Sequence, residues 1–317
     1  TNKEARIINE NGRPVFWLGD ENPKIVLLAH LDTVWPIGSF NPTWKVDGDI
    51  AFGPGTFDMK AGFLQALYAI KDLSLDQIAL IGTTDEETGS QTSKDLINKV
   101  SAKADAVLIL ESSINGKVKT GRKGTAMYRI VVNGKASHAG LEPEKGINAT
   151  VEIANQISKI ISLENKKLGT TVVPTTLISG TTTNTVPASA ILDVDVRSFS
   201  ISELERIDKS IKSLMPTLSG ATLSITGGIN RPPLEERSTL ELYEKLEASA
   251  KKLSRQEVGK IKVGGASDGN FAGIHTQVLD GLGAVGEGAH ATHEHIFASH
   301  LEPRSQLLAS LVKEILA

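Results

Sequence analysis

The clearest pattern along the chain is a set of short runs in which almost every residue is apolar. The runs are 24–29 (KIVLLA), 78–83 (IALIGT), 106–110 (AVLIL) and, more weakly, 277–284 (QVLDGLGA). Runs of this length are typical of parallel strands that are buried on both faces. The segments 60–73 and 92–103 instead place their apolar residues along one stripe of a helix. Strands that alternate with helices predict an α/β domain with right-handed crossovers.

The middle of the chain has a different pattern, in which the predicted strands are apolar on one face only. Between 192 and 197 (LDVDVR), apolar and charged residues alternate. The predicted strands here are 125–137, 170–180, 190–200 and 221–228, and the predicted helices are 147–165 and 201–215. The order β-α-β-β-α-β is that of a ferredoxin-like module, in which helices cover one face of the sheet.

This change of pattern predicts two domains. Residues 1–121 and 230–317 form an α/β domain with a mixed sheet and flanking helices. Residues 122–229 form a ferredoxin-like βαββαβ domain inserted into it. The glycine pair at 227–228 is a candidate hinge at the second junction, because glycine adopts backbone conformations that other residues avoid.

Composition narrows the classes of function. The chain has 317 residues, a formal net charge of −3 and no block of basic residues, so we expect no nucleic-acid partner. No apolar run approaches the ~18 residues of a membrane-spanning helix, and the polar start TNKEARIINE is not a signal peptide. We therefore expect a cytoplasmic protein without membrane contact, while a leader removed before Thr1 stays an open alternative. There are no cysteines, so a metal would bind His, Asp and Glu.

Ionisable residues follow the three strongest apolar runs, at the point where each predicted strand ends. His30 and Asp32 follow the first run, Glu86 and Glu87 the second, and Glu111 the third. A single polar residue of this kind is ordinary where a buried strand leaves the core. The carboxyl edge of an open α/β sheet is where these folds keep their sites, and three polar exits on that edge favour a functional interpretation.

Two further ionisable residues follow glycine-rich stretches. Asp58 follows GPGTF and opens a predicted helix, where its ordinary role would be that of an N-terminal cap. His290 follows DGLGAVGEGA, and the ordinary interpretation of this tract is a solvated loop. His293, three residues further on, is the alternative to His290 in any site built from this tract.

Together these residues have the chemistry of a catalytic metal centre built without cysteine. Such a centre needs several His, Asp and Glu ligands, an open position for water and a general base beside that water. The candidate ligands are His30, Asp58, Glu87, Glu111 and His290. Glu86 is the candidate base, provided that the chain bends there so that it and Glu87 serve different roles. Asp32 is the candidate partner that orients the imidazole of His30.

Eight stretches, in order along nearly the whole chain, resemble the M20 family of zinc aminopeptidases, carboxypeptidases and deacylases, and most of all its glutamate carboxypeptidase branch. They are AHLDTV, GPGTFDMKAG, TTDEETGS, VLILESS, VNGKASHAG, TNTVPASAILDVDVRS, GGASDGNFAG and AHATHEHI. The resemblance implies two Zn²⁺ ions per subunit, with Co²⁺ or Mn²⁺ as alternatives. The family also carries a helix and a strand before the first apolar run, and we expect these to be missing or very short here.

The resemblance also implies a role for each candidate in the centre. The implied ligands are Asp58 as the bridge, His30 and Glu111 on one ion, and Glu87 and His290 on the other. Glu86 would be the base that deprotonates the bridging water and passes the proton to the leaving amine. A cis peptide would join Asp58 to Met59.

The inserted domain resembles the lid, or dimerisation, domain of the family. This resemblance implies a homodimer formed through that domain. His138, in KASHAG, would reach the partner's active site and stabilise the oxyanion; its ordinary role would be that of a loop residue. Asn184 and Gly265 would contact the substrate; the first would otherwise be a turn residue and the second part of a loop.

Arg197 matches the family residue that binds a substrate carboxylate, although it could instead pair with Asp193 or Asp195. The expected function is zinc-dependent hydrolysis of the amide bond of small peptides or N-acyl amino acids with a free carboxylate, C-terminal glutamate being one candidate. The alternative is an N-acyl amino-acid deacylase of the acetylornithine deacetylase or aminoacylase kind. A non-catalytic binding relative is disfavoured because the base and every ligand are retained.

Overall fold

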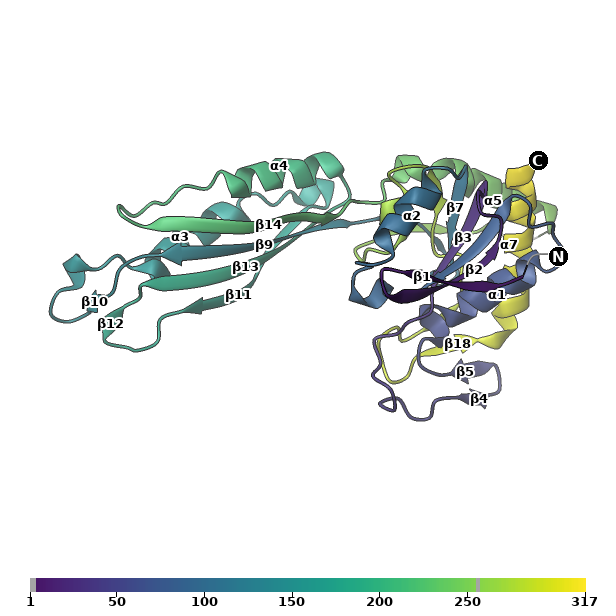
Figure 1. Cartoon of the computed structure of the whole chain (residues 1–317), viewed down its shortest axis with the longest axis horizontal. Coiled ribbons are helices and arrows are strands. Elements are labelled where there is room, and N and C mark those ends of the chain that lie inside the picture. Colours follow the sequence, from purple (N-terminus) through teal and green to yellow (C-terminus); the bar gives the residue numbers. More distant parts are fainter. Residues whose placement is uncertain (1–3, 255–256) are drawn as a thin grey trace. The chain divides into compact units, whose positions relative to one another are not determined.

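The computed structural model describes residues 4–254 and 257–317, which divide into two compact units (Figure 1). The second unit is Lys123–Pro233, and the first unit comprises the described residues on either side of it. The predicted hinge at the glycine pair 227–228 is wrong. These glycines lie inside strand β14 (Thr222–Arg231) and pair with strand β9 of the second unit.

The first unit is built on a mixed sheet. In spatial order its strands are β1 (Arg6–Glu10), β2 (Arg13–Gly19), β6 (Ile78–Thr83), β3 (Ile25–His30), β7 (Ala106–Ile109) and β16 (Gln277–Leu279). The last four run parallel, as the apolar runs predict. β1 and β2 form a hairpin that joins the sheet antiparallel to β6, so the expectation that a strand before the first run is missing or very short is wrong.

The hairpin has a sequence signal that the apolar pattern does not include. Its turn is Asn11-Gly12, and both residues have positive φ, 51° and 88°. Asn-Gly is the dipeptide that two-residue hairpin turns favour, because both positions of such a turn need a left-handed backbone. The turn therefore fixes the register of two strands that are only partly buried.

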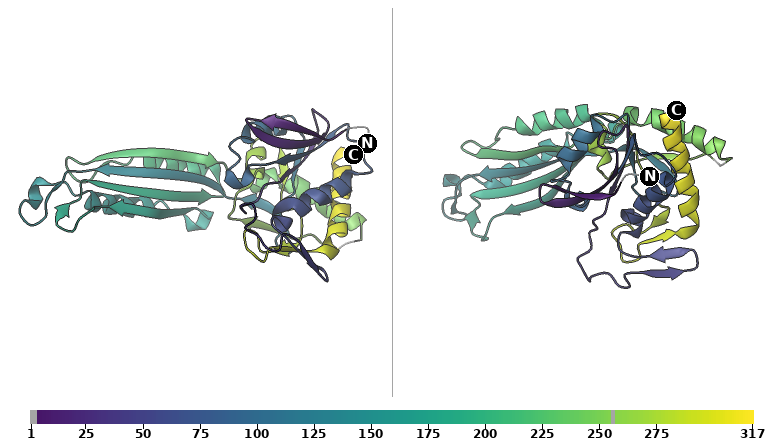
Figure 2. Two further views of the ribbon diagram at one scale, coloured as in Figure 1. Left: turned by 60° about the horizontal axis from the view of Figure 1, so that its bottom comes forward. Right: turned by 45° about the vertical axis from the view of Figure 1, so that its right-hand side comes forward.

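Alternate residues of β3 enter two different cores. Ile25 and Leu27 pack in the core that contains helices α1 (Ala61–Ile70), α5 (Leu240–Lys252) and α7 (Leu301–Leu316). Val26 and Leu28 pack in the core under α2 (Lys94–Ser101) and α6 (Gly269–Ala272). Helices thus cover both faces of the sheet (Figure 2), which is why the strand is apolar at every position.

A smaller antiparallel sheet completes the first unit. In spatial order it contains β17 (Gly286–Glu287), β18 (His295–Phe297), β5 (Ile50–Phe52) and β4 (Lys45–Asp47). A short parallel pair joins β8 (Val118–Arg122) to β15 (Lys260–Val263). The pairing of β18 with β5 brings the chain before Asp58 beside the loop that carries His290.

The second unit has the predicted ferredoxin-like arrangement. In spatial order its antiparallel strands are β11 (Thr171–Ser179), β13 (Ser189–Ser198), β9 (Gly124–Asn133) and β14. Helices α3 (Ala149–Ile161) and α4 (Ile201–Lys212) share one apolar core with this sheet. A small pair, β10 (Ser137–His138) with β12 (Thr185–Val186), extends from it.

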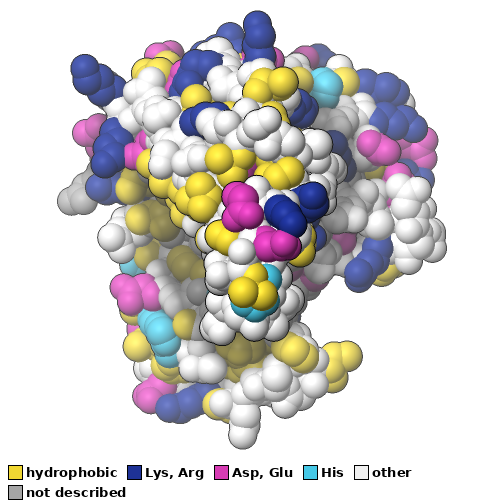
Figure 3. Space-filling model, turned by 90° about the vertical axis from the view of Figure 1, so that its left-hand side faces the viewer, with side chains coloured by type: hydrophobic (Ala, Val, Ile, Leu, Met, Phe, Trp, Pro, Cys, Tyr) yellow, Lys and Arg dark blue, Asp and Glu magenta, His cyan; other side chains and the backbone are white. Residues whose placement is uncertain are grey.

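The surface agrees with the charge pattern of the sequence. On the face that Figure 3 shows, Lys and Arg side chains are interspersed with Asp and Glu side chains. Within the described ranges 4–254 and 257–317, none of the helices combines the length and the apolar character that a membrane span requires.

Candidate metal centre

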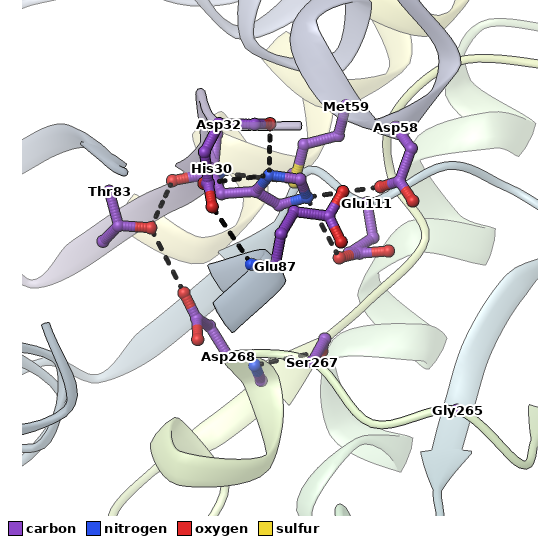
Figure 4. Close-up of polar contacts among 12 residues, drawn as sticks. His30, Asp32, Asp58, Met59, Thr83, Glu87, Glu111, Gly265, Ser267 and Asp268 are labelled. Atoms are coloured by element: carbon purple, nitrogen blue, oxygen red, sulfur yellow. Dashed lines mark hydrogen bonds and ion pairs between the residues drawn. The ribbon is translucent and has the colours of Figure 1, made fainter. Parts of the chain in front are cut away.

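The structure brings the five candidate ligands together beside the carboxyl edge of the parallel strands, and Figure 4 shows four of them, His30, Asp58, Glu87 and Glu111. They come from the end of β3 (His30), helix η1 at Thr56–Lys60 (Asp58), helix η2 at Glu86–Thr88 (Glu87), the chain after β7 (Glu111) and the loop after β17 (His290). The parallel strands β3, β6 and β7 therefore each lead into one of these residues where the apolar run ends, whereas Asp58 and His290 come from η1 and from the loop after β17.

Asp58 lies between the two imidazoles. Its Oδ1 is 3.2 Å from Nε2 of His30, and its Oδ2 is 3.3 Å from Nε2 of His290. Oε1 of Glu111 is 3.7 Å from the same nitrogen of His30, and Oε2 of Glu87 is 3.1 Å from that of His290. The donors thus fall into two groups that share one carboxylate. This is the donor set that two metals about 3.5–4 Å apart need, so the residues fit a dinuclear centre.

Two details of this geometry bear on the expectations from sequence. The peptide between Asp58 and Met59 is cis, as the resemblance implied. Between the two histidines of the last motif, the geometry favours His290. Nε2 of His290 lies 3.1 Å from Oε2 of Glu87 and 3.3 Å from Oδ2 of Asp58.

Asp32 orients His30 from the opposite side of the ring. Nδ1 of His30 lies 3.2 Å from the carbonyl oxygen of Asp32 and 3.5 Å from its carboxylate Oδ1. The other carboxylate oxygen of Asp32 accepts the backbone N–H of Glu87 at 3.1 Å. One side chain therefore ties β3 to η2 and leaves Nε2 of His30 directed at Asp58 (Figure 4).

The electrostatics of the cluster are those of an anionic site that attracts cations. Burial and the charge of Asp58 raise the pKa of Glu87 to about 7. Burial disfavours the His30 imidazolium, but hydrogen bonds to Asp32 and Asp58 outweigh this and raise the pKa of His30 well above its usual value. Without a metal the cluster therefore holds protons between its carboxylates.

We expect zinc binding to displace these protons, and the number released to fall between about pH 6 and about pH 8. Glu87 and His30 of the metal-free protein are protonated at the lower pH, whereas metals bind the deprotonated forms. The affinity for zinc should therefore rise with pH. Calorimetric titrations in buffers of different ionisation enthalpy measure the release, and a value independent of pH would contradict this account.

Glu86 and Glu87 can serve different roles because η2 is a helical turn rather than an extended segment. Glu87 reaches His290, whereas Glu86 lines a small cavity together with His30, Met59 and Glu111. That position places Glu86 beside the ligand cluster, where a general base would have to lie.

Asp268, which sequence reasoning did not single out, braces the strand end that leads to η2. This buried carboxylate accepts a hydrogen bond from the hydroxyl of Thr83 at 3.3 Å (Figure 4) and another from the hydroxyl of Ser90. Ser90 closes the turn that carries Glu86 and Glu87. Asp268, at the start of α6, therefore supports the turn that carries the candidate base. The sequence signal for this role was the position of Asp268 in the motif GGASDGN.

Two buried cations beside Glu111 were also missed. Oε2 of Glu111 is 3.0 Å from Nη2 of Arg122 and 3.5 Å from Nζ of Lys119. Arg122 also makes a bidentate pair with Asp280, at 2.7 and 2.9 Å, and donates to the carbonyl of Gly265 at 3.3 Å. Oε2 of Glu111 is thus engaged by protein, which leaves Oε1 for a metal.

The remaining candidates for substrate binding lie in the second unit. Nδ1 of His138 accepts the backbone N–H groups of Gly140 and Leu141, at 3.1 and 3.2 Å. The N–H of Ala139 donates to the carbonyl of Asn184 at 2.9 Å, so the structure brings His138 and Asn184 into one small two-stranded region.

Arg197 lies on the polar face of β13 in the same unit. It makes a two-pronged ion pair with Asp195, at 2.9 and 3.2 Å, which is one of the two pairings that the sequence left open. Its side chain is still 40% exposed. The guanidinium is therefore held in place by Asp195 and accessible from solvent.

Comparisons with known proteins agree with these motifs. The family model described as peptidase family M20/M25/M40 matches residues 26–314. Carboxypeptidase G2 of Pseudomonas sp. (strain RS-16) is 30% identical over 314 residues, which cover 94% of this chain and 75% of that protein. Succinyl-diaminopimelate desuccinylase of Ralstonia nicotianae is 27% identical over 329 residues, covering 94% and 84%.

The fold is shared as well. The crystal structure of aminopeptidase PepT from Bacillus cereus superposes with a TM-score of 0.83 at 22% identity, covering 99% of this chain and 89% of that one. The family model and the sequence relatives both extend over nearly the whole described chain. The chain therefore belongs to peptidase family M20/M25/M40.

Proposed function

We propose that this chain is a dinuclear zinc enzyme that releases an amino acid from small peptides or N-acyl amino acids with a free carboxylate. Hydrolysis of amide bonds is the activity of its family, whose enzymes depend on two metal ions. The observation that carries the proposal is the placement of Asp58, which directs one oxygen toward each imidazole. Two bound ions would polarise the substrate carbonyl and lower the pKa of a water between them.

The protein's own groups would handle the proton. Glu86, beside His30 and Glu111, would accept it from the attacking water and deliver it to the leaving nitrogen. Asp32 would keep the imidazole of His30 oriented throughout, through Nδ1. Glu111, whose Oε2 is bound by Arg122, would hold its metal through Oε1.

His138 would supply a donor to the developing oxyanion. Because its Nδ1 accepts two backbone N–H groups, the neutral ring carries its proton on Nε2, which can then donate. Asn184, next to it, and Gly265, held by Arg122, are the proposed contacts to substrate. We further propose the homodimer through the second unit, in which His138 acts on the partner's substrate, and the cytoplasmic location expected from sequence.

We expect Arg197→Ala to raise KM about tenfold or more for substrates with a free carboxylate, and to leave kcat largely unchanged. The guanidinium is partly exposed and preset by Asp195, so it can make a bidentate pair with a carboxylate. Initial rates with a peptide and with its C-terminal amide measure the effect. Equal KM values for wild type and variant would leave Arg197 as the partner of Asp195 only.

A deacylase is the second candidate, favoured by the likeness to succinyl-diaminopimelate desuccinylase. The carboxypeptidase and the deacylase differ in which part of the substrate the pocket recognises. Initial rates with a panel of N-acyl and peptidyl compounds separate them. Fastest release of C-terminal Glu or Asp supports the carboxypeptidase, preference for acetylated basic amino acids supports the deacylase, and no release from any compound overturns the proposal.

A further inference from the structure

Glu294 is a buried carboxylate that belongs to the loop of His290 but contacts the segment of Asp58. Its side chain is 1% exposed. Oε2 accepts the backbone N–H of Gly55 at 2.8 Å, and Oε1 accepts the N–H groups of Phe57 and Asp58, each at 3.0 Å. Three hydrogen bonds therefore join this one side chain to the backbone that presents Asp58.

The segment that donates these bonds is an irregular start to helix η1. Gly55 has a left-handed φ of 68°, and Asp58 and Met59 have non-helical backbone angles within η1. Backbone N–H groups at such a start lack partners within the helix and, when buried, need an acceptor from elsewhere. Glu294 supplies that acceptor, and one of the three groups is the N–H of Asp58 itself.

The same residue also fixes the other side of the centre. Glu294 is four residues after His290, and its own carbonyl accepts the N–H of Gly53 at 3.4 Å. Gly53 and Gly55 lie just before Asp58. Glu294 therefore connects the loop of His290 to the segment of Asp58 twice, through its backbone carbonyl and through its side chain. That connection joins the two segments that carry Asp58 Oδ2 and His290 Nε2, which lie 3.3 Å apart.

We propose that Glu294 is a positioning residue that sets the zinc affinity of the centre by holding Asp58 and the His290 loop in register. The inference rests on the proposed dinuclear function and adds a residue that would bind no metal itself. Replacing a residue that orients metal ligands typically lowers the metal affinity 10–100-fold.

Glu294→Gln is the sharpest test, because glutamine has the same size but only one carbonyl oxygen. Its NH₂ group must face the N–H of Gly55 or those of Phe57 and Asp58, and two donors cannot bond to each other. We expect the free zinc concentration at half-saturation to rise 10–100-fold. Equilibrium dialysis against buffered zinc, with metal content measured directly, gives this value without any activity assay.

Glu152 offers a matched control in the second unit. It is also a fully buried glutamate, and it accepts the backbone N–H groups of Thr217, at 3.0 Å, and Leu218, at 2.7 Å. Glu152→Gln should lower the thermal unfolding temperature of the metal-free protein, as Glu294→Gln should, but leave zinc affinity unchanged. Zinc affinity therefore separates a positioning role from general support of the fold.

The outcomes are distinct. If wild type binds two zinc ions and Glu294→Gln is half-saturated at the same free zinc concentration, this inference is overturned and the proposed function stays intact. Wild type that takes up no zinc overturns both. If Glu294→Gln does not fold, Glu294→Asp decides: it keeps both oxygens on a shorter side chain, and we expect at least a severalfold loss of zinc affinity, whereas unchanged affinity overturns the proposal.

Discussion

Glu86→Gln is expected to keep both zinc ions and to lower kcat by about 10²–10⁴-fold, the usual contribution of a general base. Glutamine has nearly the same shape as glutamate and can still accept a hydrogen bond, but it cannot take a proton from water at neutral pH. Glu86 lines the cavity beside His30 and Glu111, whereas the contacts to the second imidazole come from Glu87. Removing the carboxylate of Glu86 should therefore affect turnover and spare metal binding.

The neighbouring residue provides the control for this prediction. Glu87→Gln alters the adjacent side chain of the same helical turn, but it removes a group 3.1 Å from His290 Nε2. We expect this variant to lose zinc from the His290 side. Metal content measured by atomic spectrometry, alongside kcat, distinguishes the two. Loss of zinc from Glu86→Gln, or turnover close to that of wild type, would show that Glu86 is not the base.

Asp58→Asn should have the largest effect on the centre itself. Asparagine replaces one of the two oxygens that face His30 and His290 by an NH₂ group, which donates hydrogen bonds and cannot bridge metals. The bonds from Glu294 go to backbone N–H groups, so the fold of the segment should survive. We expect at most one zinc ion per chain and a fall in kcat greater than the ~10²–10⁴-fold expected for loss of a base.

This prediction is checked by metal content and circular dichroism on the same preparation. A folded variant with two zinc ions would mean that Asp58 does not bridge them. A variant with one zinc ion and substantial activity would mean that a single metal is enough for the reaction.

Much of the fold was predictable because its signals are local. The apolar runs that became β3, β6 and β7 are buried on both faces, and their ends mark the edge where ligands meet. The alternation around Asp193 likewise predicted a sheet covered on one face. The hairpin of β1 and β2 was missed since its strands are only partly buried, although Asn11-Gly12 was a usable signal.

The supporting residues of the site were not predictable in the same way. Lys119 and Arg122 occur in KVKTGRKG, where lysine and arginine side chains would ordinarily be exposed, and only the packed structure shows that both are buried beside Glu111. His290 was a candidate from sequence, but its φ of 62°, a conformation that residues other than glycine seldom adopt, left the direction of its imidazole without a sequence signal. These contacts depend on segments far apart in the chain.

The central claim is that paired metals held around Asp58 drive amide hydrolysis, and metal restoration tests it most directly. Protein stripped with a chelator is assayed for release of free amino acid from peptides with a C-terminal Glu or Asp and from N-acyl amino acids, before and after zinc is returned. The account predicts no release from the stripped protein and full recovery as the second zinc ion per chain is bound. Release that is equally fast without metal, or no release with two zinc ions bound, would contradict it.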